Sequence, residues 1–455
     1  MPVDTGEGTD SLDMEANSAP THVSAFRWVV LGILGCIVML VNADQAAFGV
    51  ALPSIKSEFH IGNAQAGLFA AMMNFGFAAM QIPAGLAVGR LGARKVMLVG
   101  LIVTAIAAVQ VGSSVTARDV MTFRCILGLA EASFSLCCVS VINQWFPNRE
   151  RGTANGLYWG ASKLGPVVAP PLAVIVIQEL GWRSIFKIFA IPVLVVALLW
   201  FLFVHNRPEQ SRYGKMPSAG IGGEEALGQA PPATKYEARV PRWLDRAIRL
   251  RPVTPIASAG GVFRSWNLIG NAFAGALIVG VFYVFVAWLP SYLVTEKHFD
   301  LRTAGLLSSV LFVGTAAGNF TGGWLSDKVL GMRRKPLTLF GPLLSSIALI
   351  ILCYSPADKA LVGVLLLLTG FVIGLGYAQF FVYPMAVTTA ETYPVAFAVL
   401  NIGCITAAGL FPLLTGFVLD ASGWTVAFFM LAGAAAFSFV LVATIDEPML
   451  TKPCG

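Results

Sequence analysis

Charged residues are scarce in this chain of 455 residues: Asp, Glu, Lys and Arg make up 12% of it, while 56% of the residues are hydrophobic. Soluble domains contain about 25% charged residues, so the composition excludes an ordinary soluble protein. The apolar residues form continuous runs of about 20 instead of alternating with polar ones, which excludes a transmembrane β-barrel. The sequence predicts an all-α membrane protein with several spans.

Motifs for metal, nucleotide or covalent chemistry are also lacking. The seven cysteines have no metal-ligand spacing, and we interpret them as small packing residues. His22, His60, His205 and His298 fall in tails or at loop edges. We find no phosphate-binding glycine loop, zinc motif or nucleophile elbow. These absences argue against an ATP-driven pump or an enzyme, and we expect no metal and no cofactor.

The net charge of +6 does not indicate nucleic-acid binding, because the basic residues gather in particular loops between apolar runs. The first 25 residues are acidic and polar, unlike the basic start of a signal peptide. We expect residues 1–25 to be a disordered tail. We also expect membrane lipids around the apolar runs, no nucleic-acid partner, and a monomer.

Twelve apolar runs are long enough to cross a bilayer core of about 30 Å as helices. Six form a predicted N-terminal bundle (26–204), at 26–50, 63–87, 95–116, 119–143, 151–178 and 183–204. Six more form a predicted C-terminal bundle (263–446), at 264–294, 303–326, 336–355, 359–385, 392–419 and 423–445. A polar linker at 205–262 joins the bundles, and a tail follows at 447–455.

Within the linker, residues 236–251 (YEARVPRWLDRAIRLR) interleave arginines with Val240, Trp243, Leu244 and Ile248. This pattern is typical of a basic amphipathic helix on an anionic membrane surface. A solvated linker helix explains it nearly as well.

Basic residues favour the loops that follow the even-numbered spans, such as Arg90, Arg94 and Lys95 after the second. The opposite loops are short and mixed in sign. By the positive-inside rule, we expect both termini in the cytoplasm and the chain in the inner (plasma) membrane of a cell.

The fourth span carries Arg124 and Glu131, seven residues apart, so two helical turns place both on one face. An ionised group inside the bilayer costs from about 3 to more than 10 kcal/mol unless it faces water or a partner. We therefore expect this helix to line a polar cavity. The alternative is a structural ion pair buried between helices.

A similar pattern follows spans two and eight: GLAVGRLGARK at 85–95 and GWLSDKVLGMRRK at 323–335. Each copy starts with a glycine and ends in a basic cluster. Repeats at equivalent positions favour two homologous bundles related by an axis along the membrane normal.

With this layout the chain resembles the major facilitator superfamily over nearly all of its length apart from the tail and linker. The resemblance implies twelve transmembrane helices in two pseudo-symmetric bundles. It also implies a conformational gate at the repeated loops, formed by Gly85, Arg90, Arg94, Gly323, Asp327 and Lys328. The superfamily usually has an aspartate where Gly89 stands, whereas Asp327 is present in the second copy. We therefore expect the C-terminal half to carry most of this lock.

Several stretches resemble, more narrowly, the anion:cation symporter branch, which includes sugar-acid and aromatic-acid proton symporters. They are NADQAAFGVALP (42–53), Arg124 with Glu131–Ala132, WFPNRERGTANG (145–156), Gly181–Trp182 and YVFVAWLPSYL (283–293). The resemblance implies that Asp44 and Glu131 couple transport to protons, and that Arg124 binds the substrate carboxylate or couples to the acids. A guanidinium is chemically suited to clamp a carboxylate. A structural acid paired across a helix interface is the alternative for Asp44.

The branch commonly has an arginine at the position of Gln45. Because that arginine would help to hold an anionic substrate, its absence leaves the identity of the substrate undecided. Lys163, about a dozen residues into the fifth predicted span, could replace that cation and contact an anionic ligand. A long side chain that reaches the membrane interface is the alternative. Gly165–Pro166 and Ala169–Pro170 partly resemble a signature of antiporters and drug exporters, which favours export, although proline in a span more often marks a kink.

Polar side chains elsewhere in the spans are further candidates for the substrate site. We name Asn42, Gln45, Tyr158, Tyr283, Gln379 and Asn401 beside Arg124 and Lys163. Asn and Gln inside spans can equally join helices. We favour Tyr283 and Gln379, because spans seven and ten flank the cavity in the family.

Together these features predict a secondary transporter that imports a small organic anion, a carboxylate such as a sugar acid or aromatic acid, with protons by alternating access. A proton-coupled exporter of a drug, siderophore or metabolite, and an uncoupled facilitator, remain alternatives.

Overall fold

The structure is a computed structural model that describes residues 25–208, 250–251, 253–331, 333–389 and 391–448. Residues 1–24 of the predicted tail (1–25), most of the linker, including residues 236–249 of the predicted basic helix, and residues 449–455 lie outside this range. The N-terminal elements are α1 (Phe26–Phe59), α2 (Asn63–Leu91), α3 (Ala93–Val111), α4 (Ala117–Glu131), α5 (Phe134–Trp145), α6 (Asn148–Ser162), α7 (Leu164–Leu180) and α8 (Trp182–Phe203). The C-terminal elements are β1 (Leu250–Arg251), α10 (Ala259–Arg264), α11 (Trp266–Thr295), α12 (Leu301–Trp324), the π-turn η2 (Leu325–Val329), α13 (Lys335–Cys353), α14 (Lys359–Val387), α15 (Tyr393–Thr444) and β2 (Glu447–Pro448).

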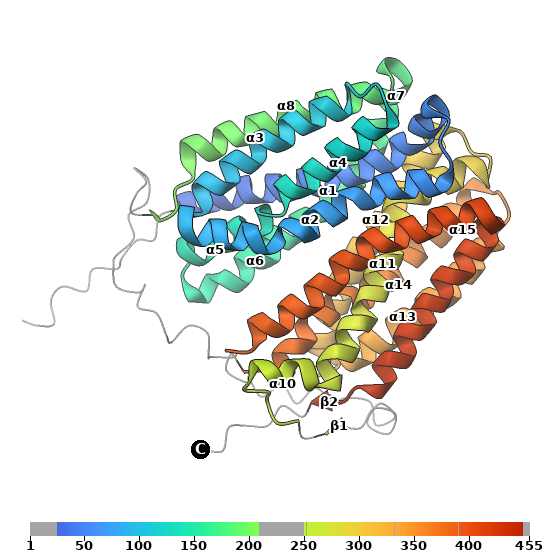
Figure 1. Cartoon of the computed structure of the whole chain (residues 1–455). Helices are drawn as coiled ribbons and strands as arrows, with labels where there is room; N and C mark the ends of the chain where they lie inside the picture. Colours follow the sequence, from blue (N-terminus) through green and yellow to red (C-terminus); the bar gives the residue numbers. More distant parts are fainter. Residues whose placement is uncertain (1–24, 209–249, 252, 332, 390, 449–455) are drawn as a thin grey trace, which may run out of the picture.

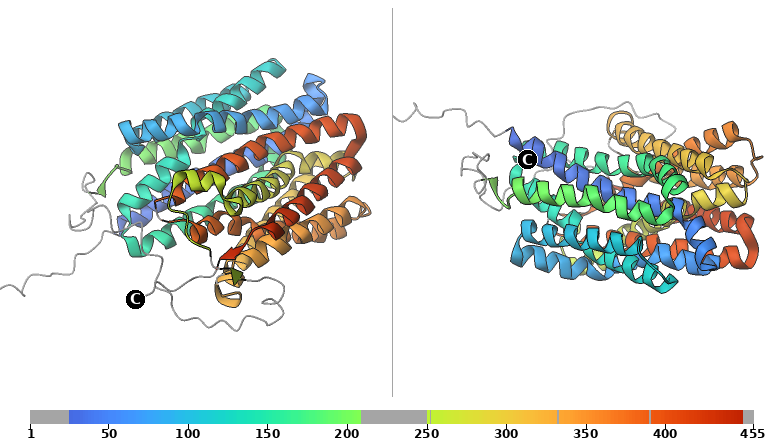
Figure 2. Two further views of the ribbon diagram at one scale, coloured as in Figure 1. Left: turned by 60° about the horizontal axis from the view of Figure 1, so that its bottom comes forward. Right: turned by 90° about the horizontal axis from the view of Figure 1, so that it is seen from above.

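Two bundles of long apolar helices lie side by side (Figure 1 and Figure 2). Within the described residues, eleven helical segments are long and apolar enough to cross a membrane, and α15 crosses it twice because the chain reverses at Gly423. The predicted all-α fold with twelve spans in two bundles is confirmed. The last two residues of the predicted basic helix form β1, which pairs in parallel with β2.

Three predicted spans are interrupted. Span four divides into α4 and α5 at Ala132–Ser133, directly after Glu131. Span five divides into α6 and α7 at Lys163, since Pro166 lacks an N–H and its ring crowds the carbonyl of Ser162. Span eight ends in the π-turn η2 at Leu325–Val329. The first two interruptions fall at candidate site residues.

The two bundles repeat the same turn between their last two spans. Gly181 and Gly423 both adopt positive φ values, 79° and 77°, which favour glycine because a Cβ would be strained there. A tryptophan follows each glycine and returns to the first span of its own bundle. Trp182 donates to Glu58 at 2.6 Å, and Trp424 donates to Thr295 at 3.0 Å. This repetition supports the internal symmetry inferred from the loops.

We call the end of the bundles where the described chain begins, at Phe26, the termini face, and the opposite end, with the turn at 60–62, the far face. The far face lies at the right in Figure 1. There α2 packs along α15, α1 along α11 and α7 along α12.

Glycines bring the two backbones into direct contact on the far half. A Cβ at Gly49 would lie 2.2 Å from the Val286 carbonyl oxygen, and one at Gly67 would lie 2.6 Å from that of Pro412. A Cβ at Gly416 would lie 2.4 Å from the Asn63 carbonyl oxygen. Such distances exclude any side chain at these positions, so the bundles are closed against each other toward the far face.

Candidate functional site

A buried ion pair joins the first and fourth spans. Nη1 of Arg124, on α4, lies 2.6 Å from Oδ2 of Asp44, on α1, and the two side chains are only 2% and 1% exposed. The guanidinium carbon also lies 4.0 Å from the centre of the Phe48 ring, a cation–π contact that helps to hold it in an apolar layer. Within the described part of the chain, Asp44 Oδ1 and Arg124 Nε have no hydrogen-bond partner.

Glu131 ends α4 on the same face as Arg124, as the seven-residue spacing predicted. It is 1% exposed, and neither carboxylate oxygen has a hydrogen-bond partner among the residues that the structure describes. Its charge interacts with those of Asp44 and Arg124, so the three groups form one electrostatic cluster. Tyr283 of the other bundle is close enough to interact with Glu131 as well. The cluster therefore holds two acids and one base at the surface between the bundles.

A small pocket opens beside this cluster and is shared by both bundles. Its N-terminal wall is formed by Gln45, Phe48, Ala70, Asn74 and Arg124, and its C-terminal wall by Tyr283, Val286, Ala287 and Pro412. Two of the predicted substrate-binding residues, Gln45 and Tyr283, thus face each other across the interface next to Arg124. The amide of Asn74 donates to the Ala408 carbonyl at 3.3 Å and connects the bundles at this level.

Lys163 lies between α6 and α7 and reaches the opposite bundle. Its Nζ is 4.8 Å from the centre of the Tyr377 ring and 5.6 Å from that of Phe282. The next turn is fixed on α1, because a Cβ at Gly165 would lie 2.2 Å from the Met39 carbonyl oxygen. Lys163 therefore points inward, toward aromatic rings, and not to the membrane interface.

The other predicted binding residues are distributed differently. The Asn42 amide donates to the Val38 carbonyl of its own helix at 2.8 Å. Tyr158 is buried within the N-terminal bundle, hydrogen-bonded to Cys138. Asn401 is half-buried in α15. Gln379, which we placed at the cavity, instead accepts a hydrogen bond from Arg334 at 3.2 Å. Its role in binding substrate stays a prediction.

The repeated loops differ between the two bundles. In the N-terminal copy, Arg94 donates from Nη2 to the Phe201 carbonyl at 2.6 Å, which caps the end of α8. Lys335 plays the same part in the C-terminal copy, with Nζ donating to the Ile445 carbonyl at 2.5 Å. Arg90 is exposed, and Gly85 lies in an exposed part of α2.

In the C-terminal copy Asp327 forms an ion pair with Arg334 at 2.6 Å, and the same Nη1 donates to the Ser326 hydroxyl at 2.7 Å. Lys328 is exposed on the same π-turn, and a Cβ at Gly323 would meet no atom within 4 Å. The loop with an aspartate thus holds an ion pair that includes this residue, while Gly89 in the other loop offers no side chain for one. The role of these residues as a conformational gate stays a prediction.

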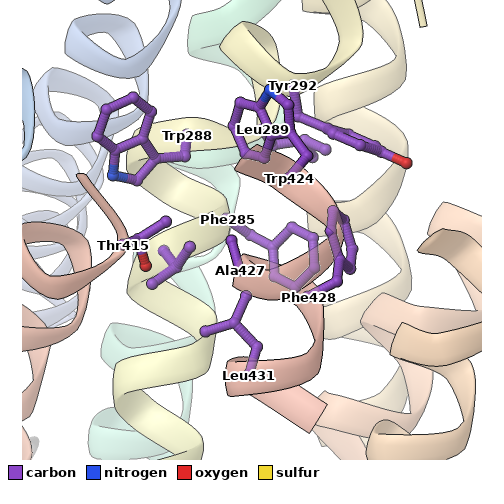
Figure 3. A pocket seen from close by; sticks show the side chains of 10 residues that line it. Phe285, Trp288, Leu289, Tyr292, Thr415, Trp424, Ala427, Phe428 and Leu431 are labelled. Atoms are coloured by element: carbon purple, nitrogen blue, oxygen red, sulfur yellow. The ribbon is translucent and has the colours of Figure 1, made fainter. Parts of the chain in front are cut away.

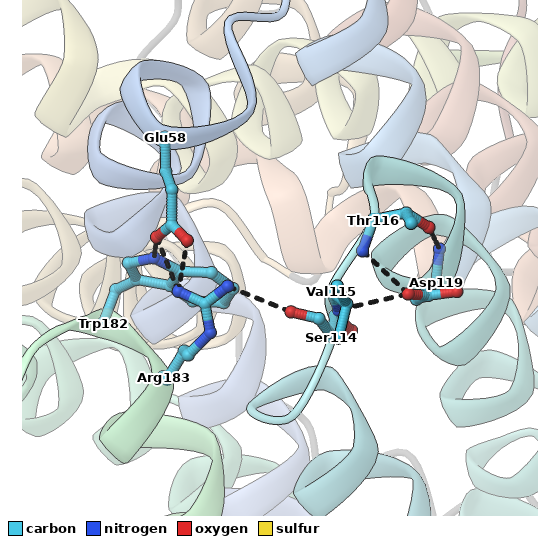
Figure 4. A network of polar contacts seen from close by, with 7 residues as sticks. All are labelled: Glu58, Ser114, Val115, Thr116, Asp119, Trp182 and Arg183. Carbon is cyan, nitrogen blue, oxygen red and sulfur yellow. Dashed lines mark hydrogen bonds and ion pairs between the residues drawn. The ribbon is translucent and has the colours of Figure 1, made fainter.

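Two polar clusters on the far face had no counterpart in the sequence prediction. Glu58 accepts from Trp182 and Arg183, and Arg183 donates in turn to the Ser114 carbonyl at 3.0 Å (Figure 4). This cluster ties together α1, α8 and the turn after α3. Asp420, in α15 just before the reversal at Gly423, accepts from the backbone N–H groups of Asn63 and Ala64 at 2.9 and 2.8 Å. An exposed acid near a helix end is common in sequences, so it gave no signal.

A second small pocket, between α11 and α15, is lined mainly by aromatic rings (Figure 3). Trp288, Tyr292, Trp424 and Phe428 pack there edge to face or tilted, with Tyr292 and Phe428 centred 4.8 Å apart. The indole N–H of Trp288 donates to Pro412 at 3.0 Å, and that of Trp424 is used at Thr295. Its indole donors are therefore satisfied, and it belongs to the packing of the C-terminal bundle.

Comparison with known proteins bears on the fold and the class of protein. The family model described as Major Facilitator Superfamily matches residues 34–401 and, in a second match, residues 272–453. A solved structure of a bacterial homolog to the human lysosomal transporter Spinster is similar with a TM-score of 0.69 at 18% identity. That similarity covers 92% of this chain and 94% of the other, and it supports the fold alone.

Curated relatives match nearly the whole chain at low identity. The chain is 26% identical to the probable sulfoacetate transporter of Cupriavidus necator, over 93% of this chain and 95% of that protein. It is 24% identical to the hexuronate transporter of Bacillus subtilis, over 90% and 93%. It is 23% identical to the probable L-galactonate transporter of Escherichia coli, over 94% and 92%. All three names describe transporters of organic anions.

Proposed function

This chain belongs to the Major Facilitator Superfamily and is a multi-pass membrane transporter, not an enzyme, and from that premise we propose that it imports a small organic anion together with protons. The substrate would be a carboxylate or a chemically similar anion, as the names of the relatives suggest. Alternating access would expose the pocket between the bundles to one side of the membrane at a time.

One observation carries the proposal: the Asp44–Arg124 ion pair lies beside the unpaired carboxylate of Glu131 at the surface between the bundles. Burying an ionised carboxylate without a partner costs several kcal/mol, whereas a protonated one costs much less. A proton on Glu131 therefore suits the arrangement seen here. If Arg124 turns to a substrate carboxylate, Asp44 loses its partner and gains the same reason to take up a proton.

Binding of anion and proton would be linked in both directions. An anion that draws Arg124 away from Asp44 favours protonation, and protonation of Asp44 frees Arg124 for the anion, by the same free energy. Loading both neutralises the cluster, which makes the loaded carrier easier to rock through its closed intermediate than the half-loaded one. This is the physical basis for symport in place of leakage of either species.

From the basic loops and the positive-inside rule we infer that the termini face would lie in the cytoplasm, with the chain in the plasma membrane of a cell. With the far face closed by backbone contacts, the structure would then represent a state of the carrier that is closed toward the outside of the cell. A potential of about 100 mV, negative inside, favours cation entry by about 2.3 kcal/mol per charge, so more than one proton per monoanion would make import electrogenic.

Uptake into proteoliposomes tests the proposal directly. We expect a proton gradient directed inward to drive accumulation of a labelled anion, with sulfoacetate, glucuronate, galactonate and benzoate as the probes. Asp44→Asn and Glu131→Gln should abolish gradient-driven accumulation while leaving exchange between labelled and unlabelled anion across the membrane. Lys187→Gln, a change at an exposed residue of α8, is the matched control and should transport normally.

The alternatives give different results in the same vesicles. Accumulation driven by the opposite proton gradient would identify an exporter that exchanges protons for its substrate. Transport without any dependence on the gradient, with Asp44→Asn fully active, would identify an uncoupled facilitator and refute the proposed coupling.

A further inference from the structure

Arg124 and Lys163 both lie close to the surface between the bundles, but only Arg124 is paired with an acid. Arg124 is held by Asp44 at 2.6 Å. Lys163 forms no ion pair with any residue in the described part of the chain, and its ammonium group lies near the rings of Phe282 and Tyr377. An incoming anion therefore finds an uncommitted charge at Lys163, whereas at Arg124 it must compete with a carboxylate.

The position of Lys163 is fixed from both sides. The break between α6 and α7 places it outside regular helix, and the backbone contact of Gly165 with α1 holds the following turn at Met39–Ala43, directly before Asp44. From the other bundle, the ring of Tyr377 on α14 and that of Phe282 on α11 contact the ammonium group. Lys163 is thus a cation of one bundle presented against rings of the other.

The rings around Lys163 form a continuous aromatic surface. Phe282 contacts Tyr283 and Tyr377 edge to face, with centres 5.7 and 5.8 Å apart, and Tyr377 contacts Phe381 at 5.7 Å. Tyr283 also lines the pocket next to Arg124. The aromatic surface therefore runs from Lys163 to the Asp44–Arg124 pair, and it offers ring faces and edges to whatever lies between them.

Hydrogen-bonding groups for a polyhydroxylated substrate are fewer. The amides of Asn42, Asn74 and Asn271 donate to backbone carbonyls, and that of Gln379 is bound to Arg334. Among the described residues, the Asn271 amide oxygen and both polar side-chain atoms of Asn319 have no hydrogen-bond partner. A sugar acid would therefore find few free amide groups for its several hydroxyl groups, and burying the remaining hydroxyl groups without partners is costly.

We infer that Lys163 and the rings of Phe282 and Tyr377 form one subsite, split between the bundles, for the anionic group of a carboxylate with an apolar or aromatic body. The inference rests on the proposed transport function and makes its substrate class narrower. The anion replaces the rings as the main partner of the ammonium, because a charge-assisted hydrogen bond is stronger than a contact with a ring face. The body of the substrate then packs on the rings that the ammonium leaves.

Equilibrium binding to the purified full chain in detergent tests this without any gradient. The probes are benzoate, its neutral analogue benzamide and D-galactonate, and the readouts are calorimetric affinity and thermal stabilisation. We expect benzoate to bind more tightly than galactonate, and benzamide not to bind. Lys163→Gln should weaken benzoate by about 10- to 100-fold, whereas Lys163→Arg should retain most of the affinity and Lys187→Gln all of it.

A second variant covers the case in which Lys163→Gln does not fold. Phe282→Leu keeps an apolar side chain but removes a ring, and it should weaken benzoate several-fold while leaving acetate, a carboxylate without a ring, unaffected. Unchanged benzoate affinity in a folded Lys163→Gln, tighter binding of galactonate than benzoate, or no binding of any probe would overturn the inference. Because no proton gradient is used, Lys163-dependent benzoate binding would survive a failure of the proposed proton coupling, and proton-driven uptake would survive a failure of this subsite.

Discussion

Asp420 connects the two bundles on the far face through a geometry normally used to cap a helix. Its carboxylate belongs to α15 but accepts from the first backbone N–H groups of α2, those of Asn63 and Ala64. Lys56, which contacts the Asn63 side chain, adds a positive charge close by. When the bundles rock apart at the far face, these hydrogen bonds must break, so Asp420 should stabilise the closed arrangement relative to the open one.

The size of the effect follows from the two hydrogen bonds. Capping a helix N-terminus with a carboxylate contributes about 1–2 kcal/mol. Asp420→Ala should therefore raise the ratio of far-open to far-closed carrier by about 5- to 30-fold. For a carrier that is about 95% closed on this face, the open fraction would rise to roughly 20–60%.

Pulsed electron paramagnetic resonance on spin-labelled, cysteine-free protein can measure this ratio. Labels at Val115 and Ala357, exposed on the far face of different bundles, should report longer distances in Asp420→Ala, and labels at Leu91 and Glu391 on the termini face should report shorter ones.

Asp300→Ala is the matched control for the Asp420 variant. Asp300 caps α12 with Oδ2 accepting from Thr303 N–H at 3.0 Å, but both residues belong to one bundle. The Asp300→Ala variant removes a similar helix cap but changes no contact between the bundles. Distances that are equal in the two variants and the parent would refute the role of Asp420 as a link between bundles.

Two further predictions concern stability. Arg124→Gln leaves Asp44 buried without its partner and should lower the free energy of unfolding by about 3–5 kcal/mol, while the double variant Asp44→Asn/Arg124→Gln should lose less; an equal loss in both, measured by denaturation in mixed micelles, would contradict a strong pair. Gly165→Val places atoms against the Met39 carbonyl oxygen and should prevent the folded state from accumulating, whereas Gly160→Ala, where a Cβ meets no atom within 4 Å, should be neutral or slightly stabilising in a thermal-unfolding assay; normal yield of Gly165→Val would contradict the contact.

The sequence predicted the features that run length and the helical repeat determine by themselves. Run length predicted the spans, and the seven-residue spacing predicted that Arg124 and Glu131 share a face, since helical geometry leaves little choice. The identity of the partner helix was expected only through a family resemblance, because nothing local to Asp44 specifies that Arg124 lies opposite.

Properties that depend on level and direction across the membrane could not be predicted. The sequence allows Lys163 to point to lipid or inward, and its contacts with the Phe282 and Tyr377 rings of the other bundle show that it points inward. Gln379 was expected at the cavity because of its span, and its amide oxygen accepts a hydrogen bond from Arg334 at the start of α13, a contact that the sequence did not predict. The link at Asp420 depends on two helices more than 350 residues apart in sequence, and no periodicity encodes such a meeting.

The glycine contacts of the far half indicate how the closed carrier remains impermeable to ions. Gly49, Gly67 and Gly416 each lie against the backbone of the opposite bundle. The barrier to ions in the far half is therefore formed by main-chain atoms. Separating these backbone contacts exposes few large apolar side chains to water. Re-forming the contacts does not require any side chain to change its rotamer. Opening and closing of the far half can then follow from the tilting of the two bundles alone, so the transport cycle repeats without any rearrangement of side chains at the barrier.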